Sequence, residues 1–195
     1  MKVGFFGGSF NPPHMAHVFA TCLLLSTEPL DTILIVPTFK HPFGKPLVPF
    51  EHRMRMCEMA MGWMPRVYVS SIELELGGES HTIRTITHLA ETHPSWSLQL
   101  IIGEDQLLEA HKWKRFDTLC HMTPPLILKR TSFSADSSHA QSNIALLPSL
   151  SSTEIRQKLA QEQWDELHHL VPHRVIKYIR THRLYLSPLP PSKTS

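Results

Sequence analysis

The stretch Gly7-Gly8-Ser9-Phe10-Asn11-Pro12-Pro13-His14-Met15-Ala16-His17 joins a short apolar segment to a longer one near the start of the chain. Residues 2–6, before it, have the length and apolar character of a buried parallel strand. Residues 18–25, after it, are apolar enough for a packed helix. We therefore predict a strand-to-helix turn that opens an α/β domain. In open parallel sheets such turns line the ligand crevice at the carboxyl ends of the strands.

The residue types in this turn favour phosphate binding. Gly7 and Gly8 lack a Cβ atom, so backbone N–H groups there can approach a ligand closely. His14 and His17 lie three residues apart and share a face of the first helical turn, where free N–H groups and the helix dipole favour an anion. Either histidine alone would favour a different interpretation, a glycine- and proline-rich loop with solvated imidazoles. The complete string after a strand favours the phosphate interpretation. It contains neither the dinucleotide-binding fingerprint G-x-G-x-x-G nor the G-K-[ST] of a Walker A loop, so it is neither of these two motifs.

The composition is that of a globular chain. Its 195 residues suffice for one domain with its own core, and the net charge is +2 with histidine neutral. This balance predicts no general nucleic-acid surface, and no apolar run is long enough to span a membrane. Cys22, Cys57 and Cys120 lack C-x-x-C spacing, so we expect buried free thiols in a reducing cytoplasm and no zinc site. The chain enters a strand at once, so no signal peptide is expected and the localisation is predicted to be cytoplasmic.

Strand and helix patterns alternate along the chain. Strand patterns occupy residues 2–6, 31–36, 67–72, 97–102, 125–129 and 144–147, and helical patterns occupy 18–25, 50–61, 81–90, 152–161, 164–169 and 172–182. The alternation predicts a Rossmann-like, doubly wound parallel sheet with a small C-terminal helical part. We expect one domain over residues 1–186, with the helical part at 150–186. Residues 131–142 are predicted to form a mobile surface loop, and 187–195 a disordered tail.

A second phosphate motif lies near the other end of the chain, Leu150-Ser151-Ser152-Thr153-Glu154-Ile155-Arg156. A serine or threonine at a helix start caps the free N–H groups, and the same N-terminus can hold a phosphate. Arg156, one turn further on, offers a planar fork to phosphate oxygens. The alternative interpretation is an ordinary capped helix with a surface arginine.

Together these motifs resemble those of the HxGH nucleotidyltransferase superfamily, and within it the nicotinate (or nicotinamide) mononucleotide adenylyltransferases. That family typically carries GGSFNPxHxGH and I-S-S-T-x-I-R, and Ala16 stands where the family usually has glycine. Residues 171–179 resemble the family's V-P-x-x-V-x-x-Y-I, which favours the pyridine-nucleotide branch over the phosphopantetheine adenylyltransferases. The resemblance extends over nearly the whole chain, to Arg183.

The resemblance implies three groups of site residues. The expected catalytic residues are His14, His17 and Arg156. The expected ATP-binding residues are Gly7, Gly8, Ser9, Phe10, Gly103, Asp105, Ser152 and Thr153, with Asp105 accepting hydrogen bonds from the ribose. The expected mononucleotide-binding residues are Lys45, Thr82 and Trp113. Trp113 would border the nicotinate ring, or it would be a hydrophobic anchor between helices.

Two further segments depart from the family's pattern. In residues 80–85 the family commonly has S-Y-T-I-D-T, whereas His81 and Arg84 replace the tyrosine and the aspartate here. We interpret Arg84 as a solvated helix charge. Residues 38–49 carry Lys40 and Lys45 where the family has a P-P-H-K-like string. Either lysine would neutralise phosphate charge; the alternative interpretation is a solvated basic loop. Arg53 matches a recurrent family arginine, for which we expect a structural role.

The implied reaction is adenylyl transfer from ATP to nicotinate mononucleotide, which gives nicotinate adenine dinucleotide and pyrophosphate. The attacking phosphate is already an anion, so the protein must orient two anions and neutralise developing charge, without a catalytic base. Mg²⁺ bound with ATP would bridge the triphosphate oxygens, and no metal site formed by protein residues alone is expected.

Three questions stay open at this point. The first is the acceptor: nicotinate mononucleotide is expected, and the alternatives are nicotinamide mononucleotide or a different phosphate-bearing acceptor. A different acceptor would make the chain another adenylyl- or cytidylyltransferase of the same superfamily. The chain is an enzyme, or it is a nucleotide-binding sensor without turnover. Its expected partners are ATP and a pyridine mononucleotide, with no nucleic acid and no membrane, and a homo-oligomer stays open.

Overall fold

Five parallel strands form the central sheet of the computed structural model, which describes residues 1–128 and 150–186. The strands are β1 (Lys2–Gly8), β2 (Thr32–Pro37), β3 (Val67–Val69), β4 (Ser97–Gly103) and β5 (Pro125–Leu128). Their order in the sheet is β3-β2-β1-β4-β5, and every neighbouring pair is parallel. All residues of β2 are buried, as expected for a strand covered on both faces. The predicted fold class is confirmed.

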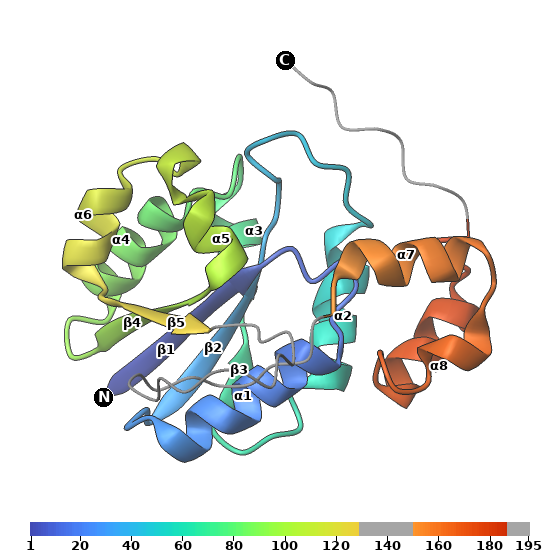
Figure 1. Ribbon diagram of the computed structural model, residues 1–195. Coiled ribbons are helices and arrows are strands. Elements are labelled where there is room, and N and C mark those ends of the chain that lie inside the picture. The colour runs from blue at the N-terminus through green and yellow to red at the C-terminus, as the bar shows by residue number, and fades with distance from the viewer. Residues whose placement is uncertain (129–149, 187–195) are drawn as a thin grey trace, which may run out of the picture.

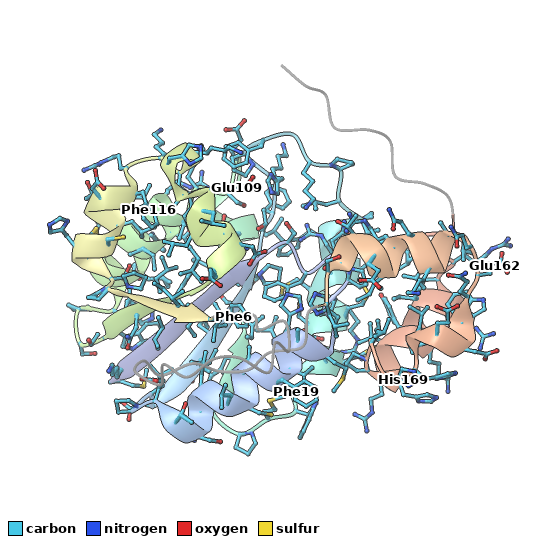
Figure 2. The ribbon with its side chains drawn as sticks, viewed as in Figure 1. Phe6, Phe19, Glu109, Phe116, Glu162 and His169 are labelled. Atoms are coloured by element: carbon cyan, nitrogen blue, oxygen red, sulfur yellow. The ribbon has the colours of Figure 1, made fainter. Side chains whose placement is uncertain are left out.

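Helices cover both faces of the sheet (Figure 1). They are α1 (Met15–Thr27), α2 (Phe50–Ala60), α3 (Ile72–Leu76), α4 (Thr82–Thr92), α5 (Glu104–Leu108), α6 (Phe116–Met122), α7 (Ser152–Ala160) and α8 (His173–Thr181), with 3₁₀ turns η1 (Ala110–Lys112) and η2 (Trp164–Leu167). Side chains alternate along β1, so Phe6 belongs to one apolar cluster and Phe5 to the other. Figure 2 labels Phe6 near the middle of the molecule.

The C-terminal helical part shares the core on the α1 and α2 side of the sheet. Leu159 of α7 and Ile179 of α8 are fully buried in the same apolar cluster as Met56 of α2. The backbone N–H of Met15 also donates to the carbonyl of Leu170 at 2.9 Å. Figure 1 shows α7 and α8 beside α2, on the opposite side of the molecule from α4 and α6.

Two local predictions need correction. The strand predicted at 67–72 ends at Val69, and Ile72 begins α3, because the Ser70 hydroxyl accepts the backbone N–H of Ile72 and turns the chain. The helix predicted at 164–169 is a shorter 3₁₀ turn, Trp164–Leu167. The sequence patterns also gave no sign of α5, η1 and α6, which are short and weakly periodic. The strand predicted at 144–147, the loop at 131–142 and the tail at 187–195 lie outside the described residues.

The three cysteines are free, but they are not all buried. Cys57 lies in the core, where burial raises the pKa of its thiol, and Cys120 is half-buried. Cys22 is exposed, so the prediction of a buried thiol is wrong there: it lies on the outer face of α1, where its sulfur contacts that of Met64. Over residues 1–128 and 150–186, no helix combines the length and apolar character needed to cross a membrane.

Replacing Ile179 by alanine tests whether residues 1–186 form one cooperative domain. Ile179 is fully buried in the shared cluster, so its loss is expected to lower the free energy of unfolding by about 3 kcal/mol. We expect a single urea transition, measured by circular dichroism, that shifts without splitting. Lys177→Ala on the exposed face of α8 is the control and should leave the midpoint nearly unchanged. A separate early transition for α7 and α8 would instead identify an independent domain.

Candidate active site

The carboxyl ends of β1, β2 and β4 meet at one edge of the sheet. Gly8 at the end of β1 pairs with Pro37 of β2, and Phe6 pairs with Ile101 of β4 on its other side. After β1 the chain builds first toward β2 and β3, then crosses to β4 and β5. This reversal beside β1 is the topological switch point at which open α/β sheets bind ligands.

Asn11 anchors the turn after β1 to distant parts of the chain. It is only 2% exposed, and its side-chain Oδ1 accepts the Val48 backbone N–H at 3.2 Å and the Tyr185 hydroxyl at 2.9 Å. Tyr185 lies 174 positions further along the chain. Phe10, just before Asn11, adopts a left-handed conformation with φ of 44°. The shape of the turn is thus held by long-range contacts and not by local sequence alone.

Arg53 of α2 stabilises the same turn by hydrogen bonds to backbone carbonyls. Its side chain is 1% exposed, and its guanidinium donates to the backbone carbonyls of Val48, Ser9 and Phe39 at 2.8, 3.0 and 3.4 Å. These bonds connect the turn after β1 with the loop after β2. A guanidinium committed to three carbonyls has a structural function, in agreement with the expectation for Arg53.

The imidazole rings of His14 and His17 lie against each other at the start of α1, with their planes tilted by 39°. His14 is the residue that precedes the first helical turn, and the two imidazole centroids are 3.8 Å apart. The backbone N–H of His14 donates to Nδ1 of His17 at 3.1 Å. An accepting Nδ1 carries no proton, so in neutral His17 the proton is on Nε2, and this nitrogen is a donor. The arrangement therefore fixes the tautomer that can donate to an anion.

The start of α7 is joined to the turn by side-chain hydrogen bonds. The Ser151 hydroxyl caps α7 by accepting the Glu154 N–H, which confirms that a serine caps this helix. The Ser152 hydroxyl donates to the carbonyl of Pro12 at 3.0 Å. Arg156 donates to the carbonyl of Asn11 at 2.8 Å. The two phosphate motifs, separated by most of the chain, are therefore in direct contact.

Two cavities meet at this turn. The first, here named the α7 cavity, has a volume of about 230 Å³ and is bounded by the turn, α1, the start of α5 and the start of α7. It is lined by all of the predicted catalytic and ATP-binding residues, namely His14, His17, Arg156, Gly7, Gly8, Ser9, Phe10, Gly103, Asp105, Ser152 and Thr153. The second, the α4 cavity, has a volume of about 120 Å³ and is lined by Thr82 and Trp113.

Lys45 and the other two predicted mononucleotide-binding residues line different cavities. Lys45 lines the α7 cavity together with Arg156, whereas Thr82 and Trp113 line the α4 cavity. The loop of Lys45, residues 38–49, contributes to both cavities, since His41 from the same loop lines the α4 cavity. Lys40 lines neither cavity, and its backbone pairs with that of Glu79. The sequence identified the loop, but only the conformation of the loop decided that Lys45 faces a cavity and that Lys40 does not.

The α7 cavity is electrically suited to an anion. Burial lowers the pKa of Lys45, and the positive charge of Arg156 lowers it further. Burial likewise lowers the pKa of the Arg156 guanidinium. Among the described lining residues, Asp105 is the sole carboxylate. Two partly desolvated cations with little counter-charge are stabilised by a bound polyanion.

Gly103 is required for the position of Asp105. A Cβ atom at residue 103 would lie 2.6 Å from Oδ1 of Asp105, which is far inside van der Waals contact. The Asp105 carboxylate therefore keeps its orientation in the first turn of α5 because residue 103 has no side chain. The glycine and the carboxylate form one unit directly after β4, as the resemblance implied.

The three residues that depart from the family pattern, Ala16, His81 and Arg84, are each buried or half-buried. Ala16 is 6% exposed in the first turn of α1, and its methyl group forms part of the α7 cavity wall. His81 precedes α4, with Nε2 3.3 Å from a Glu79 carboxylate oxygen. Arg84 is not simply a solvated charge, because its guanidinium lies 3.8 Å from the buried carboxylate of Glu73. The interpretation of Arg84 is corrected accordingly.

Trp113 is half-buried between an apolar neighbour and a cavity. Its ring packs edge-on against Phe116, with centroids 5.9 Å apart, and it also lines the α4 cavity. Sequence analysis missed Glu73, which lines this cavity while accepting a hydrogen bond from Thr85. It also missed Tyr185 and Gln106, since neither belongs to a local pattern that predicts its contacts.

The chain has relatives among known proteins. The family described as cytidylyltransferase-like matches residues 5–158. The chain is similar to a protein of Anaeromyxobacter dehalogenans (strain 2CP-C), 38% identical over 94% of this chain and 96% of that protein. It is also similar to one of Myxococcus xanthus (strain DK1622), 36% identical over 95% of each. Both relatives carry the name "Probable nicotinate-nucleotide adenylyltransferase".

A solved structure has the same fold. It is the Plasmodium falciparum nicotinic acid mononucleotide adenylyltransferase complexed with NaAD, with a TM-score of 0.80 and 21% sequence identity. The similarity covers 96% of this chain and 98% of that one.

Replacing Arg156 by alanine is expected to raise the pKa of Lys45. The Arg156 charge disfavours a second cation nearby, so its removal favours the protonated lysine and moves the pKa back toward the ordinary 10.5. The measurement is an NMR titration of ¹³C-methylated lysines. Arg55→Ala, which removes an exposed arginine paired with Glu58, is the matched control and should leave the Lys45 titration unchanged. A Lys45 titration that is also unaffected by Arg156→Ala would contradict the proximity of the two cations.

Proposed function

The chain belongs to the nicotinate-nucleotide adenylyltransferase family within the cytidylyltransferase-like group, and we propose that it transfers the adenylyl group of ATP to nicotinate mononucleotide. The products are nicotinate adenine dinucleotide and pyrophosphate. The observation that carries the proposal is the meeting of two cavities at residues 7–9. A transferase that joins two nucleotides needs two sites whose phosphate ends converge, and the turn after β1 lies at that convergence.

The α7 cavity is assigned to ATP. The backbone N–H groups at the N-terminus of α7, including that of Ser152, the Thr153 hydroxyl and the Arg156 guanidinium offer donors to the triphosphate, whereas the Ser152 hydroxyl is bound to the Pro12 carbonyl. Asp105, at the β4 side of the cavity, would accept hydrogen bonds from the ribose hydroxyls. Lys45 lies in this cavity, so we assign it to the phosphates of ATP and not to the mononucleotide ring.

The α4 cavity is assigned to the pyridine mononucleotide. Trp113 provides an aromatic edge for the ring, and Thr82 in the first turn of α4 provides a hydroxyl and a backbone N–H for the ring substituent. His41 lines the same cavity, and burial lowers its pKa, so near neutral pH it is an uncharged donor or acceptor. The phosphate of the mononucleotide would then point toward the turn.

The reaction needs positioning and charge stabilisation more than proton transfer. The acceptor phosphate is an anion near neutral pH and attacks the α-phosphate of ATP in line, while pyrophosphate leaves toward α7. The Nε2 donor of His17 and the adjacent His14 would stabilise charge on the phosphates between the two sites. No covalent intermediate is required.

A divalent metal bound with the nucleotide fits this site, and we propose Mg²⁺. Within residues 1–128 and 150–186 no group of three or more His, Cys, Asp or Glu could hold a metal. The triphosphate would carry such an ion, and Asp105, the sole carboxylate among the described lining residues, would face it. When bound, such an ion neutralises triphosphate charge and assists the departure of pyrophosphate.

The test of the function is pyrophosphate release from ATP and Mg²⁺ with nicotinate mononucleotide or nicotinamide mononucleotide as acceptor. We expect rapid release with the acid form. Preference for the amide would assign the specificity to the altered α4 segment around His81 and Arg84. Binding of ATP without release for either acceptor would support a nucleotide sensor and contradict the proposal.

Replacing His17 by alanine is expected to lower kcat about 100-fold while the dissociation constant for ATP changes much less, because the imidazole acts on charge that develops in the transition state. Steady-state kinetics and isothermal titration calorimetry give the two quantities. His169→Ala is the control, since His169 lies on the outside of the C-terminal part (Figure 2) and should leave both nearly unchanged. Equal losses in ATP binding and in kcat would assign His17 to ground-state binding.

A further inference from the structure

We propose that Gln106 contacts both substrates where their phosphates meet and positions them for transfer through its neutral amide. The inference rests on the proposed function and deepens it. Its starting point is geometric: the α7 and α4 cavities share, as lining residues, Gly7, Gly8, Ser9 and Gln106. A residue that lines both cavities lies on the path between the attacking phosphate and the α-phosphate of ATP.

Of these shared residues, Gln106 has the long polar side chain. Gly7 and Gly8 offer only backbone atoms, and the carbonyl of Ser9 already accepts a hydrogen bond from Arg53. Gln106 is half-buried and forms no side-chain hydrogen bond with any residue in the described ranges, 1–128 and 150–186. Its amide, which has two N–H donors and an acceptor oxygen, is thus available to ligand oxygens.

The fold explains why residue 106 reaches the junction. β4 lies beside β1, and α5 begins directly after β4, at the edge where the turn leaves β1. In the first turn of α5, Asp105 lines the α7 cavity alone, whereas Gln106 lines both cavities. Leu107 packs on the apolar cluster beneath, and Leu108 is 76% exposed. The face of α5 that is directed toward the turn therefore presents Gln106.

The charge of the surroundings explains why a neutral amide suits this position. Lys45 and Arg156 line the α7 cavity, and Lys112 and Lys114 line the α4 cavity. Among the described lining residues each cavity also has one carboxylate, Glu73 in the α4 cavity and Asp105 in the α7 cavity, so two cations outnumber one carboxylate on both sides of the junction. A neutral side chain adds hydrogen-bond donors for two converging anions without further positive charge, which would retain the products, and without negative charge, which would repel the substrates.

The decisive variant is Gln106→Glu, which keeps the size of the side chain and adds one negative charge. A charge about 5 Å from the reacting phosphates in a partly screened site is expected to lower kcat about 100-fold. Gln157→Glu makes the same chemical change on the exposed face of α7, outside both cavities, and should stay within about twofold of the parent protein. Thermal unfolding of each variant shows whether the fold is retained.

A second variant keeps the test decisive if Gln106→Glu does not fold. Gln106→Met preserves the volume and removes the amide, and it is expected to lower kcat about tenfold with the KM of each substrate within about threefold. A purely structural role would change stability without this separation of kcat from KM.

The outcomes separate the inference from the function on which it rests. If the parent protein releases pyrophosphate and both Gln106 variants keep kcat within about threefold, Gln106 does not act at the junction and the inference is wrong. If the KM of only one substrate rises, Gln106 contacts a single site, which also overturns it. If the parent protein itself releases no pyrophosphate, the proposed function fails first, and the inference fails with it.

Discussion

The site depends on keeping the turn after β1 open to a ligand while its own polar groups are satisfied. The carbonyl oxygens of Ser9, Asn11 and Pro12 accept hydrogen bonds from Arg53, Arg156 and Ser152, respectively. A buried carbonyl without a donor would cost about 1–3 kcal/mol, so these contacts allow a sharply bent turn to persist in the core. With the carbonyls bound on the protein side, the cavity side of the turn remains for an anion.

The same contacts create the electrostatic character of the site. Arg156 holds the turn through Asn11 and at the same time lowers the pKa of Lys45 across the cavity. Arg53 is the structural counterpart: it has the same guanidinium group but is buried and committed to carbonyls. The position of each arginine therefore decides that Arg53 only supports the turn, whereas Arg156 also lines the α7 cavity.

Part of this arrangement could be predicted from local patterns. Apolar runs and glycine-rich turns predicted β1, β2, β4 and β5, and the predicted catalytic and ATP-binding residues all line the α7 cavity. The segment 104–122 was not predicted, because α5, η1 and α6 are too short for a clear period. The strand predicted at 67–72 was too long, because β3 has a partner strand on one side only and a serine turns the chain.

The sequence by itself determined the parallel α/β fold, the family and the chemistry of the phosphate motifs, since these depend on residue type and on spacing within one element. Only the tertiary structure decided that Lys45 faces the α7 cavity, that Arg84 lies beside Glu73, that Tyr185 holds Asn11 and that Gln106 lies between two cavities. The physical reason is distance along the chain: Tyr185 and Asn11 are 174 positions apart. Hydrophobic periodicity predicts which face of a helix or strand is buried. Which residues of another element contact that face depends on how the elements pack.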